Sequence, residues 1–163
     1  MIELSLKING ELPYTDPFVG VVGWPDSQLV KSSDAKLLQP TKQQSEFQID
    51  KSKISFNVSD LTEGEVLLIF PNGNTATRFY RPGETSNTIL LTERCDQRCT
   101  MCSQPPKSND FTYWELYYKA CCQMPDNQTV GISGGEPTLY KKDLFKFLEQ
   151  MKADRPDLRF HVL

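Results

Sequence analysis

The chain has 163 residues, of which 24% are charged and 38% hydrophobic, and its formal net charge is −3. This composition is typical of a folded protein, and the length fits one domain or two small ones. The sequence contains no block of Lys and Arg that would recruit nucleic acid or an anionic membrane, and no apolar run of membrane-spanning length. Residues 1–8 do not resemble a secretory signal, so we expect a cytoplasmic protein that binds neither nucleic acid nor a membrane.

The first half of the chain has the pattern of short strands joined by turns. The sequence Pro-Asn-Gly-Asn at 71–74 is typical of a hairpin turn. Residues 28–50 are polar and weakly patterned, which predicts a long loop with at most a short strand near 47–49. We predict a small β domain over residues 1–82, with Arg-Pro-Gly at 81–83 as its boundary. Its strands are predicted where apolar residues alternate or run together, at 2–8, 17–24, 54–58, 66–70 and 75–80.

The second half changes to a strand–helix alternation. Asp110 is a plausible N-cap of the first helix, and Pro156 marks the end of the second. This order predicts parallel strands with right-handed crossovers, so the expected fold class is α/β, with the β domain followed by a βαβαβ segment over 83–163. Three strands make a narrow sheet, and we therefore expect a truncated piece of a longer enzyme. The predicted elements are strands at 88–91, 129–133 and 158–163 and helices at 111–121 and 141–153.

Three cysteines lie close together in a polar loop after the first of these strands. Cys95, Cys99 and Cys102 have the spacing C-x3-C-x2-C. Soft thiolates at such spacing can hold three corners of a [4Fe–4S] cubane and leave the fourth iron open to a ligand. Arg94 and Arg98 flank the cysteines and are equally compatible with balancing the thiolate charge, holding a ligand carboxylate or being solvated loop charges.

Two other interpretations of these cysteines are weaker. Structural zinc requires four ligands, and the only histidine, His161, is in a predicted strand far along the chain. Cys121 and Cys122 lie on the predicted aromatic helix, where packing is the better interpretation. Buried, inert cysteines are not expected in a loop rich in Arg, Asp and Gln. The five cysteines are odd in number and poorly spaced for a disulfide framework, which also favours metal binding.

A Gly-Gly-Glu-Pro turn follows the second predicted strand of this half. Two glycines allow a tight turn and let a ligand approach the backbone. The carboxylate of the glutamate can accept hydrogen bonds from an ammonium group. Alone, the turn fits a plain loop, but it follows the cysteine loop by one strand–helix unit. The candidate ligand-binding residues of this turn are Gly134, Gly135, Glu136 and Pro137.

The cysteine loop and this turn, taken together, resemble the radical S-adenosylmethionine superfamily. The resemblance implies that Cys95, Cys99 and Cys102 hold a [4Fe–4S] cluster, that residues 134–137 meet the methionine part of S-adenosylmethionine, and that Met101 packs near the adenine. It implies no catalytic acid or base. It also implies a full or partial (β/α) barrel and one-electron cleavage of S-adenosylmethionine to a 5′-deoxyadenosyl radical, which abstracts hydrogen from a substrate.

A closer resemblance, covering roughly residues 64–163, is to the maturase of the His-Xaa-Ser system. It depends on residues 91–106 with their Cys-Ser-Gln-Pro-Pro segment, on 132–139 and on 161–163. It implies a precursor peptide with His-Xaa-Ser repeats as the modified partner, and a cellular reductant. The same chemistry on a small molecule and a non-catalytic truncated fragment that binds peptide remain the alternatives. Residues 1–60 carry no motif that indicates a function.

Overall fold

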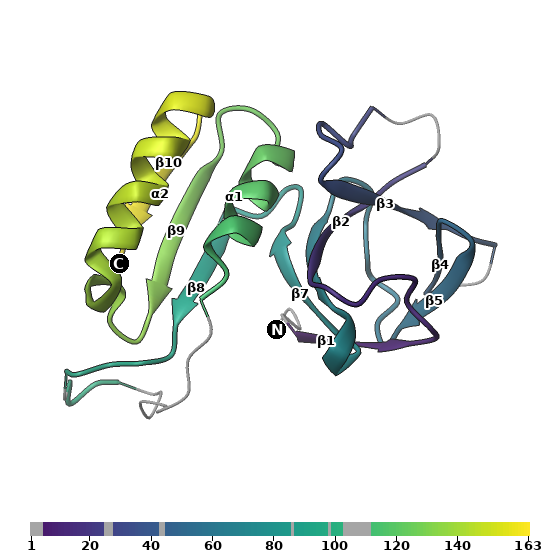
Figure 1. Cartoon of the computed structure of the whole chain (residues 1–163), viewed down its shortest axis with the longest axis horizontal. Coiled ribbons are helices and arrows are strands. Elements are labelled where there is room, and N and C mark those ends of the chain that lie inside the picture. The colour runs from purple at the N-terminus through teal and green to yellow at the C-terminus, as the bar shows by residue number, and fades with distance from the viewer. Residues whose placement is uncertain (1–4, 25–27, 43–44, 86, 98, 103–111) are drawn as a thin grey trace. The chain divides into compact units, whose positions relative to one another are not determined.

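A computed structural model describes residues 5–24, 28–42, 45–85, 87–97, 99–102 and 112–163 (Figure 1). The chain divides into two compact units. The first consists of Met1–Glu84 and Lys119–Met124, and the second of Thr85–Tyr118 and Pro125–Leu163. The sequence predicted a division after residue 82.

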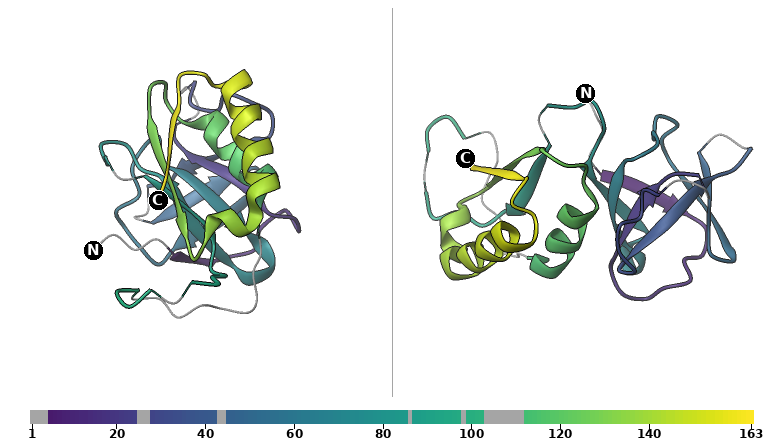
Figure 2. Two further views of the ribbon diagram at one scale, coloured as in Figure 1. Left: turned by 90° about the vertical axis from the view of Figure 1, so that its left-hand side faces the viewer. Right: turned by 90° about the horizontal axis from the view of Figure 1, so that it is seen from above.

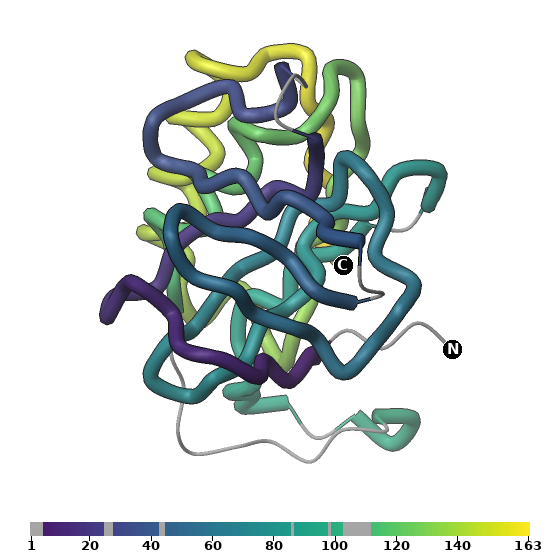
Figure 3. Tube along the Cα trace, turned by 90° about the vertical axis from the view of Figure 1, so that its right-hand side faces the viewer, coloured from purple at the N-terminus to yellow at the C-terminus, as the bar shows by residue number. Residues whose placement is uncertain are grey.

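The first unit is built around a closed barrel of seven strands in the order β1-β5-β4-β3-β2-β6-β7. Neighbouring strands are antiparallel except for β2 and β3, which are parallel. The strands can be followed along the tube in Figure 3. Their bounds are β1 Ser5–Asn9, β2 Phe18–Val22, β3 Ala35–Pro40, β4 Glu46–Ile49, β5 Ser52–Phe56, β6 Val66–Phe70 and β7 Thr75–Tyr80.

Alternation of apolar and polar residues explains how these short strands fill the barrel. In β1, Leu6 and Ile8 are buried while their neighbours are exposed. On β2, a Cβ at Gly20 would lie 2.8 Å from Ile69 Cδ1 and 2.9 Å from Leu38 Cδ1, so glycine leaves room for the core. The core consists of Leu6, Ile8, Phe18, Val22, Leu38, Phe47, Ile49, Ile54, Phe56, Leu67, Ile69 and Ala76.

The predicted hairpin at 71–74 is confirmed. Strands β6 and β7 pair antiparallel, with Phe70 opposite Thr75. A single 3-10 turn, η1 (Pro71–Gly73), joins them, and Asn74 follows it at a φ of 47°. Asparagine tolerates this left-handed conformation better than most residues do, so the local sequence suits the turn.

The second unit contains a three-stranded parallel sheet in the order β10-β9-β8. Helix α2 and the beginning of α1 lie on one face of this sheet (Figure 2). The rings of Trp114 and Phe147 are 5.8 Å apart, and those of Phe147 and Phe160 are 5.6 Å apart, so aromatic contacts join both helices to the sheet. The elements are β8 Thr88–Thr92, α1 Trp114–Gln123, β9 Thr129–Gly134, η2 Pro137–Tyr140, α2 Lys141–Asp154 and β10 Arg159–Val162.

The α/β fold class predicted for the chain is wrong, and the described residues form no partial (β/α) barrel. In the part of the chain that the structure describes, the closed barrel is the one formed by β1 to β7, with no α-helix between its strands. The parallel sheet stays open at three strands. The physical reason is that seven short strands bury their apolar side chains and remove their edges by closing on one another.

Two smaller predictions also need correction. The stretch 28–50 was predicted to be mainly a loop with a short strand near 47–49, which is β4, but it also contains β3. The helix predicted over 111–121 begins at Trp114, and Asp110 and Phe111 are outside the described residues. Across the described ranges, neither helix is long and apolar enough to cross a membrane.

Candidate metal and ligand site

The cysteine loop begins where β8 ends. Thr92, the last residue of β8, is buried, and its Oγ1 accepts a hydrogen bond from Arg94 N at 3.0 Å. Cys95 is half-buried, whereas Cys99 and Cys102 are exposed, and none of the three forms a disulfide. The strand therefore anchors the start of the loop at Thr92 and leaves the thiols beyond it accessible. Arg98 lies outside the described residues.

Two backbone turns shape the loop between the cysteines. Gln97 N donates to Cys95 Sγ at 3.3 Å, and Cys102 N donates to Cys99 O at 3.1 Å. An N–H group aimed at sulfur stabilises negative charge on it, which suits a thiolate ligand. Met101, predicted to pack near an adenine, is 96% exposed. The described residues therefore leave the Met101 side chain accessible to a ligand.

The Gly-Gly-Glu-Pro turn lies directly against the start of this loop. Gly135 N donates to Thr92 O, and Glu136 N donates to Arg94 O, both at 2.8 Å. These bonds continue the pairing of β8 and β9 past the strand ends. The structure therefore brings together two motifs that the sequence predicted to form one site.

Both glycines are required by this close approach. Gly134 has a φ of +150°, and a Cβ there would lie 2.3 Å from Thr92 O. A Cβ at Gly135 would lie 2.1 Å from Arg94 O and 3.0 Å from Cys95 Cβ. Any side chain would push the turn away from the loop, so the pair of glycines is a steric condition for this site.

Glu136 is held at the edge of the turn by Thr138. Thr138 N and Thr138 Oγ1 both donate to Glu136 Oε1, at 3.0 and 2.5 Å. These hydrogen bonds hold the pKa of Glu136 below its usual range, and the one from the hydroxyl has the larger effect. The negative charge of Asp96 acts in the opposite direction and raises this pKa. Asp96 Oδ1 accepts from Gln97 Nε2 at 2.8 Å. The turn and the loop thus present two carboxylates, which favour a cationic ligand.

The donor chemistry of the loop fits an iron–sulfur cluster, although the ligands are not gathered. No group of three or more His, Cys, Asp or Glu among the described residues stands in position to hold a metal ion. Three cysteines in one loop are nevertheless the ligand set that a cubane takes, and Gly135 leaves the space beside Cys95 that a side chain would fill. Pro137, also predicted to meet the ligand, is buried at the start of η2.

The other two cysteines and the histidine of the chain lie outside this site. Cys121 is fully buried and Cys122 half-buried on α1, which agrees with packing. His161 is exposed on β10. Thr138 and Asp96 were missed by sequence reasoning. Thr138 could have been found as the second residue after a glutamate that begins a helical turn, since such a carboxylate accepts backbone N–H groups.

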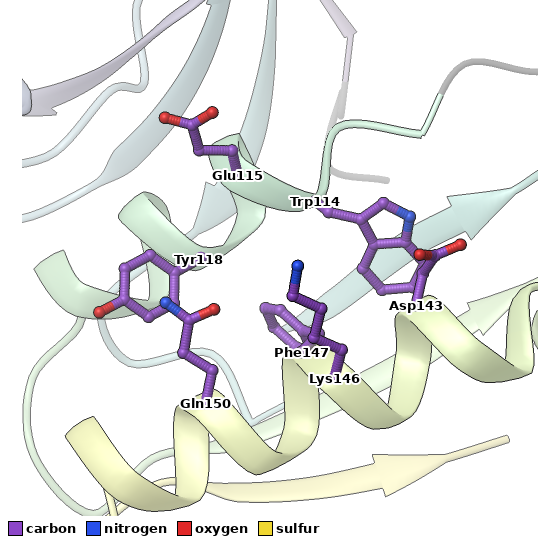
Figure 4. Close-up of a pocket in the computed structure, with 7 residues that line it drawn as sticks. All are labelled: Trp114, Glu115, Tyr118, Asp143, Lys146, Phe147 and Gln150. Carbon is purple, nitrogen blue, oxygen red and sulfur yellow. The ribbon is translucent and has the colours of Figure 1, made fainter.

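A separate hollow of about 380 Å³ lies between α1 and α2 (Figure 4). It contains none of the residues predicted for the site. Lys146 extends from α2 towards α1, above Phe147 in this view. We interpret this hollow as a consequence of helix packing. Its lining residues are Trp114, Glu115, Tyr118, Asp143, Lys146, Phe147 and Gln150.

Comparisons with known proteins give no relative. No family model matches the chain, no curated protein matches it, and no solved structure matches it. The function must therefore be inferred from the site itself.

Proposed function

We propose that this chain carries the cluster-binding and S-adenosylmethionine-binding site of a radical S-adenosylmethionine enzyme. One observation supports this above the others. The Gly-Gly-Glu-Pro turn is hydrogen-bonded to the first residues of the cysteine loop, and Gly135 approaches Arg94 O and Cys95 so closely that only glycine fits. A metal loop and an ammonium-accepting turn at the same strand ends are what this chemistry requires.

In this proposal, each motif has one task. The thiolates of Cys95, Cys99 and Cys102 hold a [4Fe–4S] cluster, and the carboxylate of Glu136 accepts the amino group of S-adenosylmethionine. Met101 packs near the adenine. When bound, the cluster supplies the electron that cleaves S-adenosylmethionine to a 5′-deoxyadenosyl radical. The protein's own residues bind and orient the ligand.

The proposed substrate is a precursor peptide with His-Xaa-Ser repeats, modified after translation, and the electron comes from a cellular reductant. The support for this peptide is the likeness of residues 91–106, 132–139 and 161–163 to a His-Xaa-Ser maturase. We place the protein in the cytoplasm because its five cysteines are odd in number and poorly spaced for a disulfide framework, as expected where thiols are kept reduced.

Anaerobic reconstitution with iron and sulfide tests the central proposal. The expected result is about four irons per chain, together with 5′-deoxyadenosine after reductant and S-adenosylmethionine are added. Cys99→Ala should lose the iron, because the thiol is one of three ligands. Cys122→Ala is the matched control, since this thiol lies on α1 outside the loop, and it should retain the iron.

The outcomes separate the competing functions. A single zinc and no iron would show that the proposal is wrong. A complete cluster with no cleavage would favour a non-catalytic fragment. Co-purification with a His-Xaa-Ser repeat peptide tests the substrate. Absence of binding to any such peptide, from a chain that does cleave S-adenosylmethionine, would favour a small-molecule substrate.

A further inference from the structure

We propose that Thr138 is a positioning residue that directs one oxygen of the Glu136 carboxylate toward the amino group of S-adenosylmethionine. This inference depends on the proposed function, because it assigns a task to a residue beside the proposed ligand contact. The geometry that carries it is the pair of hydrogen bonds from Thr138 to a single carboxylate oxygen.

Both donors of Thr138 act on the same atom. Thr138 N lies 3.0 Å and Thr138 Oγ1 2.5 Å from Glu136 Oε1. A carboxylate held at one oxygen by two donors cannot rotate freely, and its second oxygen keeps a defined direction. Glu136 N is itself bonded to Arg94 O at 2.8 Å, so both the backbone and the side chain of Glu136 are fixed beside the cysteine loop.

The charge around this carboxylate favours a cation at its second oxygen. The negative charge of Asp96 also acts on this carboxylate and opposes the lowering of its pKa. An ammonium group would therefore enter a site to which Glu136 and Asp96 contribute negative charge. One of the three N–H donors of such a group can bond to the second oxygen of Glu136 without displacing Thr138.

A purely structural role for Thr138 makes a different prediction. Glu136 is the N-cap of η2, and its bond to Thr138 N could serve only to begin that turn. In that case the hydroxyl of Thr138 would add local stability and would have no specific effect on the ligand. Binding measurements that vary the ligand and the carboxylate together distinguish these roles.

The test uses the reconstituted full chain without reductant, so that S-adenosylmethionine is bound and not cleaved. Thr138→Val removes the hydroxyl at nearly constant volume, and Thr138→Ser retains it. We expect Thr138→Val to weaken S-adenosylmethionine binding about tenfold, since a charged hydrogen bond is involved. Thr138→Ser should stay within about twofold. Equilibrium dialysis measures Kd, and iron per chain and the thermal midpoint show that each variant is folded and loaded.

Two comparisons make the result specific. In a Glu136→Gln background, Thr138→Val should add less than about twofold, because its effect passes through the carboxylate. Binding of 5′-methylthioadenosine, which lacks the amino group, should change by less than about twofold. The inference is overturned by equal binding of S-adenosylmethionine to Thr138→Val and the parent chain, or by the same loss for both ligands. A loaded parent chain that binds no S-adenosylmethionine would instead refute the proposed function.

Discussion

At the scale of single residues, the closest backbone approach in the site is at Gly135. A Cβ there would lie 2.1 Å from Arg94 O, a distance that no side chain tolerates. We expect Gly135→Ala to separate the turn from the loop, to lower iron retention and to cost about 1–3 kcal/mol of unfolding free energy. Iron per chain after reconstitution and denaturant unfolding measure the two effects.

Gly73→Ala is the control for this prediction. A Cβ at Gly73 meets Thr75 Oγ1 at 3.3 Å, which is a side-chain contact able to adjust. This variant should retain its iron and most of its stability. If Gly135→Ala behaves like Gly73→Ala in both measurements, the close approach of turn and loop does not occur in solution.

A second residue-scale prediction concerns Tyr14 in the barrel unit. Burial raises the pKa of Tyr14 to about 12, helped by a short hydrogen bond from its hydroxyl to Asp50 Oδ2 and by the charge of Asp50. Asp50→Asn should lower this pKa toward 10 without reaching it, because the burial remains. Asparagine suits the positive φ of 49° at this position, so the backbone should be preserved.

The sign of the pH dependence follows from the raised pKa of Tyr14. A group whose pKa is raised in the folded state stabilises the fold below its unfolded value, near 10, and that stabilisation is lost as the pH approaches 12. The loss of stability between these pH values should be smaller in Asp50→Asn. NMR titration of the Tyr14 ring measures the pKa, and an unchanged value in the variant would contradict the assigned contact.

At the scale of elements, an ion network joins the start of β6 to β7. Glu65 is fully buried, and its Oε2 lies 3.1 Å from Arg78 Nε in a poorly aligned charge contact. Thr62 donates twice to Oε1, at 2.9 and 3.1 Å, and Arg81 Nε lies 3.6 Å from the same oxygen. Arg78 also pairs with Asp60. Burial raises the pKa of Glu65, and contacts with Thr62 and the two arginines offset part of that rise.

Removing Arg78 should therefore be costly and pH-dependent. We expect Arg78→Met to lower the unfolding free energy by about 3 kcal/mol at pH 7. The variant leaves the charge of Glu65 buried without the arginine that offsets part of the cost of burying it. The pKa of Glu65 should rise further in the variant, and a raised carboxyl pKa favours the fold at low pH. The hydrogen bond from Arg78 also lowers the pKa of Asp60, so the variant loses a stabilisation that is present near neutral pH and disappears at low pH. The deficit should therefore shrink at pH 4, as measured by denaturant unfolding.

Lys53→Met provides the matched comparison. Lys53 Nζ lies 3.5 Å from Glu46 Oε2, but the lysine side chain is 64% exposed. Solvent screens such a pair, and its loss should cost less than about 0.5 kcal/mol at either pH. An equal deficit for Arg78→Met at pH 7 and pH 4 would show that the ion network is not the source of its effect.

At the scale of the whole molecule, each of the two compact units buries apolar residues of its own. The barrel core includes Leu67, which is fully buried, and the parallel-sheet unit has its own core. We expect Leu67→Ala to cost about 2–5 kcal/mol and to lower amide protection in the barrel strands while β9 stays protected. The second core contains Ile89, Leu91, Val130, Ile132, Leu144, Phe147, Met151 and Leu158.

Hydrogen exchange read by mass spectrometry measures this separation. The reciprocal variant, Ile132→Ala, should lower protection in β9 and leave that of β6 unchanged. Loss of protection across both units in either variant would show that the two cores unfold as one cooperative body.

Local pattern predicted the elements better than it predicted their assembly. The hairpin at 71–74 and a helix close to α2 follow from turn residues and from 3.6-residue spacing, both of which act over short distances. Strand β3 was missed because its burial does not alternate strictly, and its sequence also contains Lys36 and Gln39. Its place depends on pairing with β2 and β4, which no local pattern reports.

The sequence by itself determined the chemistry available at the site. It provides three thiols at cluster spacing and two glycines before a glutamate, because ligand types and turn residues are local properties. Tertiary structure alone decided that Gly135 lies against Arg94 and Cys95, whereas the contact of Thr138 with Glu136 is local and spans two residues. It also decided that β1 to β7 close into a barrel, contrary to the expected α/β fold. Closure requires β1 to pair with both β5 and β7, and contacts between distant segments depend on the packing of the whole unit.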